Sequence, residues 1–379
     1  MKKRNSHLIE TLAEVIERDA QDFANLTRQE LTPTEVASIL NPIKCFPKEK
    51  QVLALHWHPE QVPLPLIRKR IETMFPAEEE HLIIPTQHNQ LVAYDEFVGV
   101  EVDCYSPEFN QKVQLLLHFH QDQLKDAQVL ESMLEHTFKY RSSQLFQFLD
   151  CLTGQWGEFI LNQAAAQTGA NEAVVDFAAK MASKLTILID QNVATLHPEA
   201  VKNKLIRYFI DLQRPYYGHE WIDRVQVFVN QVKTLIKRDF DLSYFYQAQA
   251  FIEETRALGG SIVIPHPEQF WPILLADYDV DGIEAWNPQS FRYTDFLINV
   301  IEKKNRTRPD RERPILILFG DDCHLGEKLK EKTAQNAEKA SREIGFQPPW
   351  EDLHIQKLLI TAGSSKARVI AEYKNRLLS

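Results

Sequence analysis

Short apolar runs that end in histidine or carboxylate residues recur along this chain. The first, residues 51–58, has the sequence QVLALHWH and predicts a short buried strand. Side chains at positions i and i+2 of a strand point to the same face, so His56 and His58 are expected side by side at its C-terminal end. Two adjacent imidazoles can hold a metal ion, but a strand-capping histidine followed by a solvated one would leave the same pattern.

The same pattern predicts further strands at 81–88, 97–103, 113–120, 261–267, 280–287 and 314–319. The ligand-type residues that lie in these segments or directly after them are His88, Glu101, His118, His120, His266, Glu284, Asp322 and His324. A carboxylate within an apolar strand needs a partner, because burying an unpaired charge is costly. The C-terminal ends of strands are where α/β sheets and barrels hold their sites, so these side chains are candidates for one site.

Helical periodicity dominates the remaining sequence. Amphipathic helices are predicted over 7–24, from the capping box at Thr32 to Asn41, over 64–78 and over 366–378. Residues 122–258 contain long amphipathic stretches with few glycines, which predicts a helical block. We expect the charged run 302–313 to be a helix end followed by a loop, and 355–362 to be a strand.

Length and charge narrow the possible functions. A chain of 379 residues with 44% hydrophobic residues can bury a large core, in two or three domains or in one barrel with insertions. The net charge of −10 argues against general nucleic-acid binding. No apolar run approaches the roughly 20 residues that span a bilayer, and the N-terminal sequence does not have the pattern of a signal peptide. We therefore expect a cytoplasmic protein with no membrane partner. The four cysteines have no C-x-x-C spacing, which argues against a zinc ribbon or a disulfide framework.

Taken in order, these segments resemble the successive motifs of the PHP (polymerase and histidinol phosphatase) family. The motifs that carry the resemblance are His56-Trp57-His58, Thr86–Asn89, Gly99–Glu101, Leu117-His118, Gly259-Gly260 with Ile264–Pro267, Asp281–Glu284 and Gly320–His324. They fall within residues 51–122 and 245–330. The resemblance implies an α/β fold, a distorted (β/α)7 barrel with a large all-helical insertion. Its parts would be N-terminal helices at 1–48, barrel segments at 49–122 and 244–379, the latter with C-terminal elements, and the insertion at 123–243.

The resemblance also implies a set of metal ligands at the mouth of the barrel. Carried over residue by residue, they are His56, His58, His88, Glu101, His118, His266, Asp322 and His324. These would hold two or three divalent ions, of manganese, zinc or iron, with Glu101 as the bridge and with Glu101, His266 and Asp322 as the catalytic residues. Glu284 is expected either to support a ligand or to be structural, and His120 competes with His118 for one ligand position.

Two features depart from the family pattern. The Ser-Asp-Gly turn that usually follows the first histidine pair is replaced by Pro59-Glu60-Gln61, in which Glu60 is the only substitute ligand. The stretch from His88 to Glu101 is also shorter than usual. Both departures leave open a degenerate barrel without catalysis.

The function that the resemblance implies is hydrolysis of a phosphorylated small metabolite, nucleotide-like or a sugar or amino-alcohol phosphate, by a hydroxide that bridges two metals. An alternative from a different class is a metal-binding or scaffold protein whose helical insertion binds a protein partner. A hydrolase of C–N bonds is a third alternative, but no lysine ends a predicted strand in a position suited to bridge two metals. The sequence does not indicate the oligomeric state.

The helical insertion leaves the barrel after His118 and returns before His266, so its ends are expected beside the metals. Some PHP phosphatases that act on nucleotides carry a helical insertion at this point. Within it, Arg214, Tyr216 and His219 are predicted to bind substrate, because a guanidinium can clamp phosphate and a tyrosine can stack on a base. The alternative is that Arg214 pairs with a helix end and the tyrosines pack in a helical core.

Overall fold

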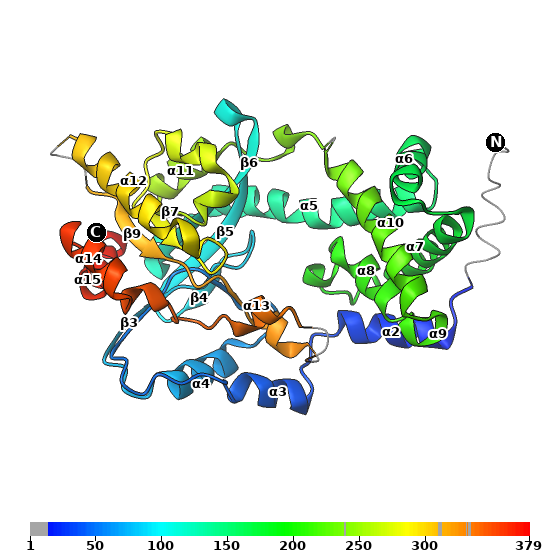
Figure 1. The fold of residues 1–379 in the computed structure, drawn as a ribbon, viewed down its shortest axis with the longest axis horizontal. Coiled ribbons are helices and arrows are strands. Elements are labelled where there is room, and N and C mark those ends of the chain that lie inside the picture. Colours follow the sequence, from blue (N-terminus) through cyan, green and yellow to red (C-terminus); the bar gives the residue numbers. More distant parts are fainter. Residues whose placement is uncertain (1–13, 239, 310–312, 331, 333–334) are drawn as a thin grey trace. The chain divides into compact units, whose positions relative to one another are not determined.

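The chain forms two compact units in the computed structural model, which describes residues 14–238, 240–309, 313–330, 332 and 335–379. A helical unit comprises the described residues up to Glu30 together with Lys139–Asp241 (Figure 1). An α/β unit comprises Leu31–Phe138 and Leu242–Ser379. The long helix α5 (Gln128–Leu152) begins in the α/β unit and continues into the helical unit.

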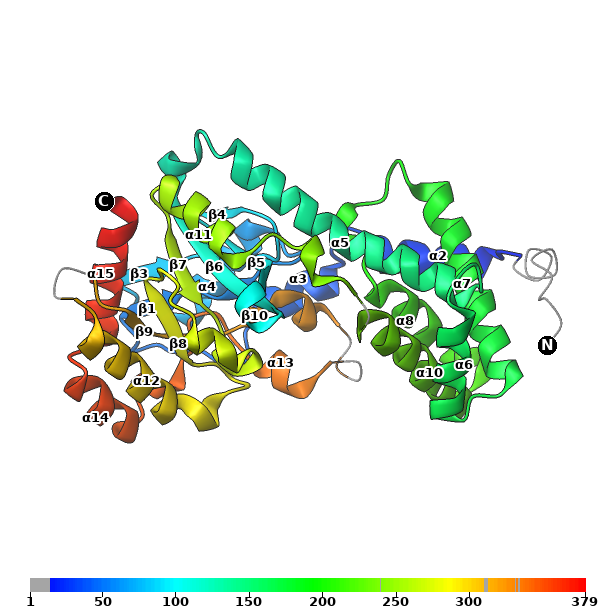
Figure 2. The same cartoon turned by 90° about the horizontal axis from the view of Figure 1, so that it is seen from above.

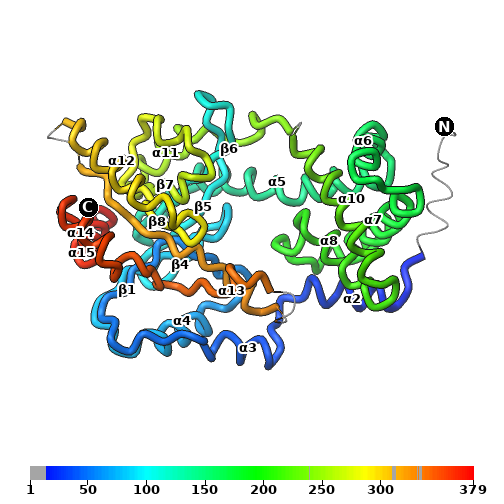
Figure 3. Tube along the Cα trace, viewed as in Figure 1, coloured from blue at the N-terminus to red at the C-terminus, as the bar shows by residue number. Residues whose placement is uncertain are grey.

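Amphipathic helices bury a shared apolar core in the helical unit. Besides part of α5, they are α2 (Glu17–Thr27), α6 (Glu158–Thr168), α7 (Glu172–Asn192), α8 (Lys204–Asp211) and α10 (His219–Arg238). The short helix α9 (Arg214–Tyr217) lies between α8 and α10 in the sequence and buries none of its residues. Helix α2, blue in Figure 3, packs on α7 and α8 through Phe23, and its Asp19 forms a buried ion pair with Lys184 of α7. The predicted helix over 7–24 is therefore observed from Glu17 onward, and residues 7–13 lie outside the described residues.

The described strands of the α/β unit fall into three hydrogen-bonded sheets. They are β1 (Gln51–Ala54), β2 (Trp57–His58), β3 (Glu80–Ile83), β4 (Val92–Tyr94), β5 (Phe97–Ser106), β6 (Gln111–His120), β7 (Ser261–Ile264), β8 (Gly282–Trp286), β9 (Leu316–Phe319) and β10 (Cys323–His324). One sheet has the order β4-β5-β6-β7-β8-β9, antiparallel from β4 to β7 and parallel from β7 to β9. The other two are the parallel pairs β1-β3 and β2-β10. The predicted α/β class is confirmed.

Backbone hydrogen bonds connect these sheets. The Thr86 amide donates to the carbonyl of Trp57 at 2.8 Å, which holds the chain after β3 against β2. The Asn89 amide donates to the carbonyl of Glu101 at 2.7 Å, which attaches the same segment to β5. On the other side, β10 follows β9 after residues 320–322 and pairs with β2. The segments that carry the predicted ligands are thereby brought together.

Helices cover the strands of the α/β unit. They are α3 (Pro33–Leu40), α4 (Leu64–Met74), α11 (Ala248–Ala257), α12 (Thr294–Thr307), α13 (Ala337–Ser341), α14 (Leu353–Thr361) and α15 (Lys366–Leu378). Helix α3 begins as predicted, since the Thr32 amide donates to Glu35 at 2.7 Å. In Figure 2, α12 and α14 lie beside each other along the sheet. None of the described helices has the length and apolar composition needed to cross a bilayer.

The predicted strand at 355–362 is wrong, because this segment forms α14. The side chain of Asp352 accepts hydrogen bonds from two backbone amides at the start of this helix. Ile355 and Leu359, four residues apart, then fall on one face and are buried. A short apolar run fits either structure, and here the capping residue and the four-residue spacing favour the helix.

Candidate metal centre

Seven of the eight predicted metal ligands lie in one cluster of the α/β unit. They form three overlapping groups, and within each group the nitrogen or carboxylate oxygen atoms lie within 4.8 Å of one another. The groups are His58 with His88 and His324, His56 with Glu101 and His266, and His56 and His58 with Asp322. Because His56 and His58 each belong to two groups, the groups form a continuous site.

Glu101 lies at the centre of this cluster, in the middle of β5, with an exposed fraction of 1%. Its Oε1 is 3.8 Å from Nε2 of His56 and 3.4 Å from Nε2 of His266. Its Oε2 is 3.7 Å from Nε2 of His58 and contacts Nδ1 of His88. Each carboxylate oxygen therefore faces two imidazoles, an arrangement in which one carboxylate can join two neighbouring metal positions.

Asp322 presents only one of its oxygens to the histidines. Its Oδ1 is 3.7 Å from Nε2 of both His56 and His58 and 3.2 Å from Nε2 of His324. Asp322 can therefore act as a ligand through a single oxygen.

The other oxygen of Asp322 is held by side chains from outside the cluster. Oδ2 accepts hydrogen bonds from Arg342 at 2.6 Å and from Gln289 at 2.9 Å. The buried Arg342 also donates to the Asp322 carbonyl at 3.1 Å and to Glu338 at 2.8 Å. These contacts fix the carboxylate plane and leave Oδ1 directed at the imidazoles.

Glu284 orients two other members of the cluster. Its Oε1 lies 2.7 Å from Nδ1 of His56, and its Oε2 accepts a hydrogen bond from the His266 amide at 2.9 Å. With Nδ1 of His56 engaged, Nε2 is the nitrogen left to face the cluster. A Cβ at Gly320 would lie 2.1 Å from Oε1 of Glu284, so a side chain at position 320 would displace this carboxylate.

The group of His58, His88 and His324 has a carboxylate neighbour in Glu60. The ring of His58 stacks on those of His324 and His88, with centroid distances of 4.2 and 4.4 Å. Oε1 of Glu60 lies 3.2 Å from Nδ1 of His324. Glu60 is thus in contact with this group. It is the residue that was expected to replace the usual ligand after the first histidine pair.

Three residues of the site adopt backbone conformations that L-residues rarely adopt. Glu60, His266 and Asp322 have φ angles of 52°, 26° and 44°. Such conformations cost roughly 1–3 kcal/mol each and persist only where the surroundings hold them. The strain coincides with side chains that must point into the cluster.

Several buried ring nitrogens in the cluster have no hydrogen-bond partner among the described residues. They are Nε2 of His56, both nitrogens of His58 and Nδ1 of His266. An unsatisfied buried polar group costs about 1–3 kcal/mol, so this concentration needs an explanation. Divalent ions bound to imidazole nitrogens and carboxylate oxygens would provide it, and this donor set suits zinc, manganese and iron.

The electrostatics of the cluster are those of a cation site. Burial opposes a charge on His56, but nearby carboxylates, led by Glu284, raise its pKa to about 10. Burial and the neighbouring imidazoles lower the pKa of His58 to about 3. Although burial opposes it, the histidines hold the pKa of both Glu101 and Asp322 well below the usual range. The cluster therefore carries anionic carboxylates balanced by a proton on His56, which a divalent ion could replace.

His118 and His120 lie outside the three groups. His118 is buried on β6, and its Nδ1 lies 2.8 Å from the hydroxyl of Tyr373 on α15. Burial and the nearby His56 lower the pKa of His118 to about 3. His120 caps the short turn that follows β6, with Nδ1 accepting a hydrogen bond from the Asp122 amide. Of the two competing histidines, only His118 is buried and close enough to His56 for that imidazole to lower its pKa.

The predicted substrate-binding residues lie in the helical unit. Arg214 forms ion pairs with Asp211 at 2.9 Å and with Asp223 at 2.7 Å. Tyr216 is 56% exposed, with the guanidinium of Arg18 3.8 Å above its ring, and His219 begins α10. Arg214 is thus held by carboxylates of its own unit, and a role of these three residues in substrate binding remains a prediction.

Sequence reasoning missed Arg342, Gln289 and Tyr373. They lie outside the apolar runs in which the ligands were recognised. Only the folded chain brings their side chains into contact with the site. The one sequence signal for Gln289 is its position just after the strand that contains Glu284. Arg342 follows a charged helical segment, and such a segment predicts a solvent-exposed position.

Comparisons with known proteins give little support of their own. No family model matches the chain, and no curated protein does. Among solved structures, the chain is similar to a protein from Bifidobacterium adolescentis whose assignment as a metal-dependent phosphoesterase is itself provisional. The two are 12% identical, the match covers 83% of this chain and 96% of the other, and the TM-score is 0.42. A likeness this distant carries no argument, so the interpretation of the site depends on its geometry.

The contacts of Arg342 predict that Arg342→Gln weakens metal binding by about 10–100-fold, the usual effect of losing a residue that orients a ligand. The matched control is Arg70→Gln, since Arg70 is equally buried in the same unit but pairs with Glu343 at 2.8 Å. That control should lower the melting temperature without a comparable loss of affinity. Metal affinity is measured by competition with a chelator, and equal losses in the two variants would contradict this role for Arg342.

Metal binding should release protons above neutral pH. Because the pKa of His56 is raised to about 10, its ring is protonated at pH 7 to 9, and a metal ion has to displace that proton. Affinity should therefore fall as the pH is lowered from about 10, whereas a site of ordinary histidines would lose affinity only below about pH 6.5. Calorimetry at pH 8 in buffers of different ionisation enthalpy measures the release, and no released proton would contradict it.

Proposed function

We propose that this protein is a metal-dependent phosphoesterase that acts on a phosphorylated small metabolite. The observation that carries the proposal is the overlap of the three ligand groups around two buried carboxylates, Glu101 and Asp322. Neighbouring metal positions that share ligands suit the displacement at a phosphoryl group, where both the attacking and the leaving oxygen need stabilisation. The choice of a phosphate ester comes from the motif resemblance described above.

The strands are proposed to form the distorted seven-stranded barrel that the motifs imply. In support, hydrogen bonds link β2 to the segment after β3, link that segment to β5, and continue across the large sheet to β9. The chain then leads from β9 through residues 320–322 into β10, which pairs with β2. The antiparallel pairing of β5 with β6 and of β6 with β7 would account for the distortion.

In the proposed assignment, His56, His58 and Asp322 would hold one ion, His266 would contribute to holding a second, and Glu101 would serve as a ligand to both. His88 and His324, with Glu60 beside them, would hold a third. His118 remains a predicted ligand, since its Nε2 is buried and has no hydrogen-bond partner in the described part of the chain. When bound, such ions lower the pKa of water and neutralise charge on phosphoryl oxygens.

The side chains around these positions have distinct proposed roles. Glu284 keeps Nε2 of His56 directed inward, and Arg342 restricts Asp322 to one oxygen. The side chains of His88 and His324 are 27% and 18% exposed, whereas those of His56 and His58 are fully or almost fully buried. Substrate is therefore proposed to enter from the side of His88 and His324.

Asp322→Asn should lower phosphatase activity by more than about 100-fold, because an amide is a poor ligand for a hard cation. The loss should exceed the effect of about 10–100-fold expected for a residue that only orients a ligand. Asp321→Asn is the matched control. Burial raises the pKa of the Asp321 carboxyl well above the usual range, in contrast to that of Asp322, and an amide at position 321 can still accept the hydrogen bond from the Gly345 amide.

The assay uses manganese-loaded protein and a panel of sugar phosphates, nucleotides and histidinol phosphate. We expect turnover of at least one ester by the native chain and by Asp321→Asn. If metal-loaded native protein turned over no member of the panel, the non-catalytic metal-binding or scaffold function would become the better interpretation.

A further inference from the structure

A lysine and an aspartate of the α/β unit form an ion pair on the face of the large sheet that carries Glu101. In the antiparallel pairing of β5 with β6, Tyr105 lies opposite Lys112, four residues along β5 from Glu101. Alternate residues of a strand share a face, and so do residues directly opposite each other, which places Asp103 and Lys112 on the face of Glu101. The ammonium of Lys112 reaches back along this face and pairs with Oδ1 of Asp103.

Asn89 connects this ion pair to the candidate metal centre. It directly follows His88, and its amide donates to the Glu101 carbonyl at 2.7 Å. Its side chain accepts a hydrogen bond from the Asp103 amide at 2.9 Å and donates to Oδ2 of Asp103 at 3.3 Å. The Asp103 carboxylate is thereby fixed beside the segments that carry His88 and Glu101, and it holds the ammonium of Lys112 there.

Lys112 combines this fixed position with access to solvent. Its side chain is 35% exposed, whereas that of Asp103 is 11% exposed. An ammonium has three N–H donors, and Asp103 is its only hydrogen-bond acceptor among the described residues. The ring of Phe245 lies nearby, with its centroid 5.6 Å from Nζ. Donors thus remain for a ligand beside the partly exposed His88.

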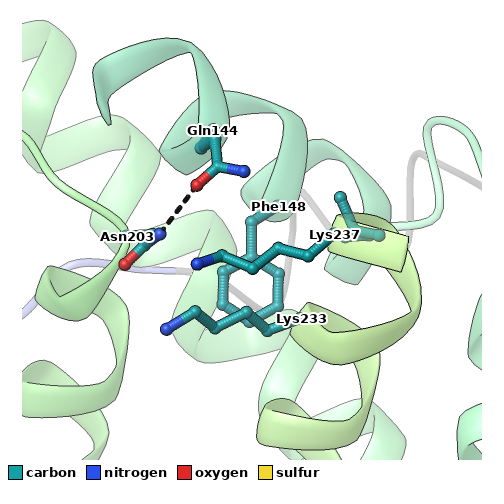
Figure 4. Close-up of a pocket in the computed structure, with 6 residues that line it drawn as sticks. Gln144, Phe148, Asn203, Lys233 and Lys237 are labelled. Atoms are coloured by element: carbon teal, nitrogen blue, oxygen red, sulfur yellow. Dashed lines mark hydrogen bonds between the residues drawn. The ribbon is translucent and has the colours of Figure 1, made fainter. Parts of the chain in front are cut away.

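Three other cations are less suited to meet a substrate of the metal centre. Arg342 donates to Asp322 but is only 4% exposed, so it is closed to a ligand. In the helical unit, Lys233 and Lys237 line the recess drawn in Figure 4, whose volume of about 10 Å³ leaves room for about one water molecule. A phosphate group does not fit into that recess. Lys112 differs from all three in being both partly exposed and held at the metal centre.

We propose that Lys112 binds the phosphoryl group of the substrate through a non-bridging oxygen, beside the proposed metal positions. This inference rests on the proposed function and adds to it a residue that recognises the substrate. A phosphoryl group carries charge on three non-bridging oxygens, and lysine meets such charge with a compact ammonium that has several donors. Asp103 is the positioning residue, because its contact with Asn89 keeps the ammonium next to the site.

The test is calorimetry of the full chain loaded with manganese, with inorganic phosphate, the expected product, as the probe. Native protein should bind phosphate, and Lys112→Met should bind it at least about tenfold more weakly, because a charge-assisted contact is lost. Lys112→Arg keeps the positive charge and should recover most of the affinity. The matched control is Lys125→Met, which removes an exposed lysine of the same unit that pairs with Asp122 at 2.9 Å. It should bind phosphate as the native protein does, and all variants should hold the same amount of manganese.

A second pair of variants separates phosphate binding from support of the fold. Lys112→Met leaves the buried carboxylate of Asp103 without its cation, which lowers stability by itself. Lys112→Met/Asp103→Asn removes both charges, whereas Asp103→Asn keeps the lysine. The double variant should bind phosphate at least about tenfold more weakly than Asp103→Asn, although neither contains an unpaired carboxylate at position 103.

Equal phosphate affinity of the native protein and Lys112→Met, or of Asp103→Asn and the double variant, would overturn the role of Lys112 and leave the proposed function standing. Loss of manganese from Lys112→Met would also overturn it, since the lysine would then act on the metal ligands. Absence of phosphate binding by the loaded native protein would overturn this inference and count against the proposed function as well.

Discussion

The carboxylate of Glu101 lies in the middle of a strand with almost no access to solvent, and a charge in that position has to be met by opposite charge nearby. Four imidazoles surround it, two from the segment 51–58 and one each from the segments that contain His88 and His266. Each of these segments reaches Glu101 only because the strands pair as they do. The Asn89 amide binds the Glu101 carbonyl, and β10 pairs with β2, so the same backbone contacts that connect the sheets also assemble the site.

The surroundings shift the pKa values of two neighbouring acids in this site in opposite directions. Asp321 and Asp322 are consecutive and both buried, yet burial raises the pKa of the first, while nearby imidazoles hold that of the second well below its usual range. Asp322 also has Arg342 on its second oxygen. Burial thus favours the protonated form of the carboxyl that accepts from the Gly345 amide, and the imidazoles favour the anionic form of the one that faces the cluster, a difference that composition alone does not show.

Much of the candidate site could be predicted from the sequence because its ligands end or interrupt apolar strands. The spacing of His56 and His58 and the presence of Glu101 in an apolar run are local properties. They can be recognised in the sequence without knowledge of the fold. The residues that orient these ligands cannot be predicted in the same way. The sequence leaves the role of Glu284 undecided and does not point to Arg342, because each acts through a hydrogen bond to a ligand. His56, the partner of Glu284, lies far from it in the sequence, and Asp322 precedes Arg342 without any local motif that links them.

The fold shows the same division between local and long-range information. The capping box at Thr32 and the helix from Lys366 are local and were predicted, whereas 355–362 was assigned to the wrong element because a short apolar run fits both helix and strand. The grouping of α2 with the helical unit depends on Phe23 and on the Asp19–Lys184 pair, which joins residues that are distant in the sequence.

We propose that this cluster of histidines and carboxylates is a metal centre with more than one ion. Anomalous diffraction from crystals of manganese-loaded protein, recorded on both sides of the manganese absorption edge, tests it most directly. We expect at least two anomalous peaks within the cluster, one bounded by His56, His58 and Asp322 and another on the far side of Glu101. Fully loaded crystals with no peak there, or with peaks only at surface carboxylates, would contradict it.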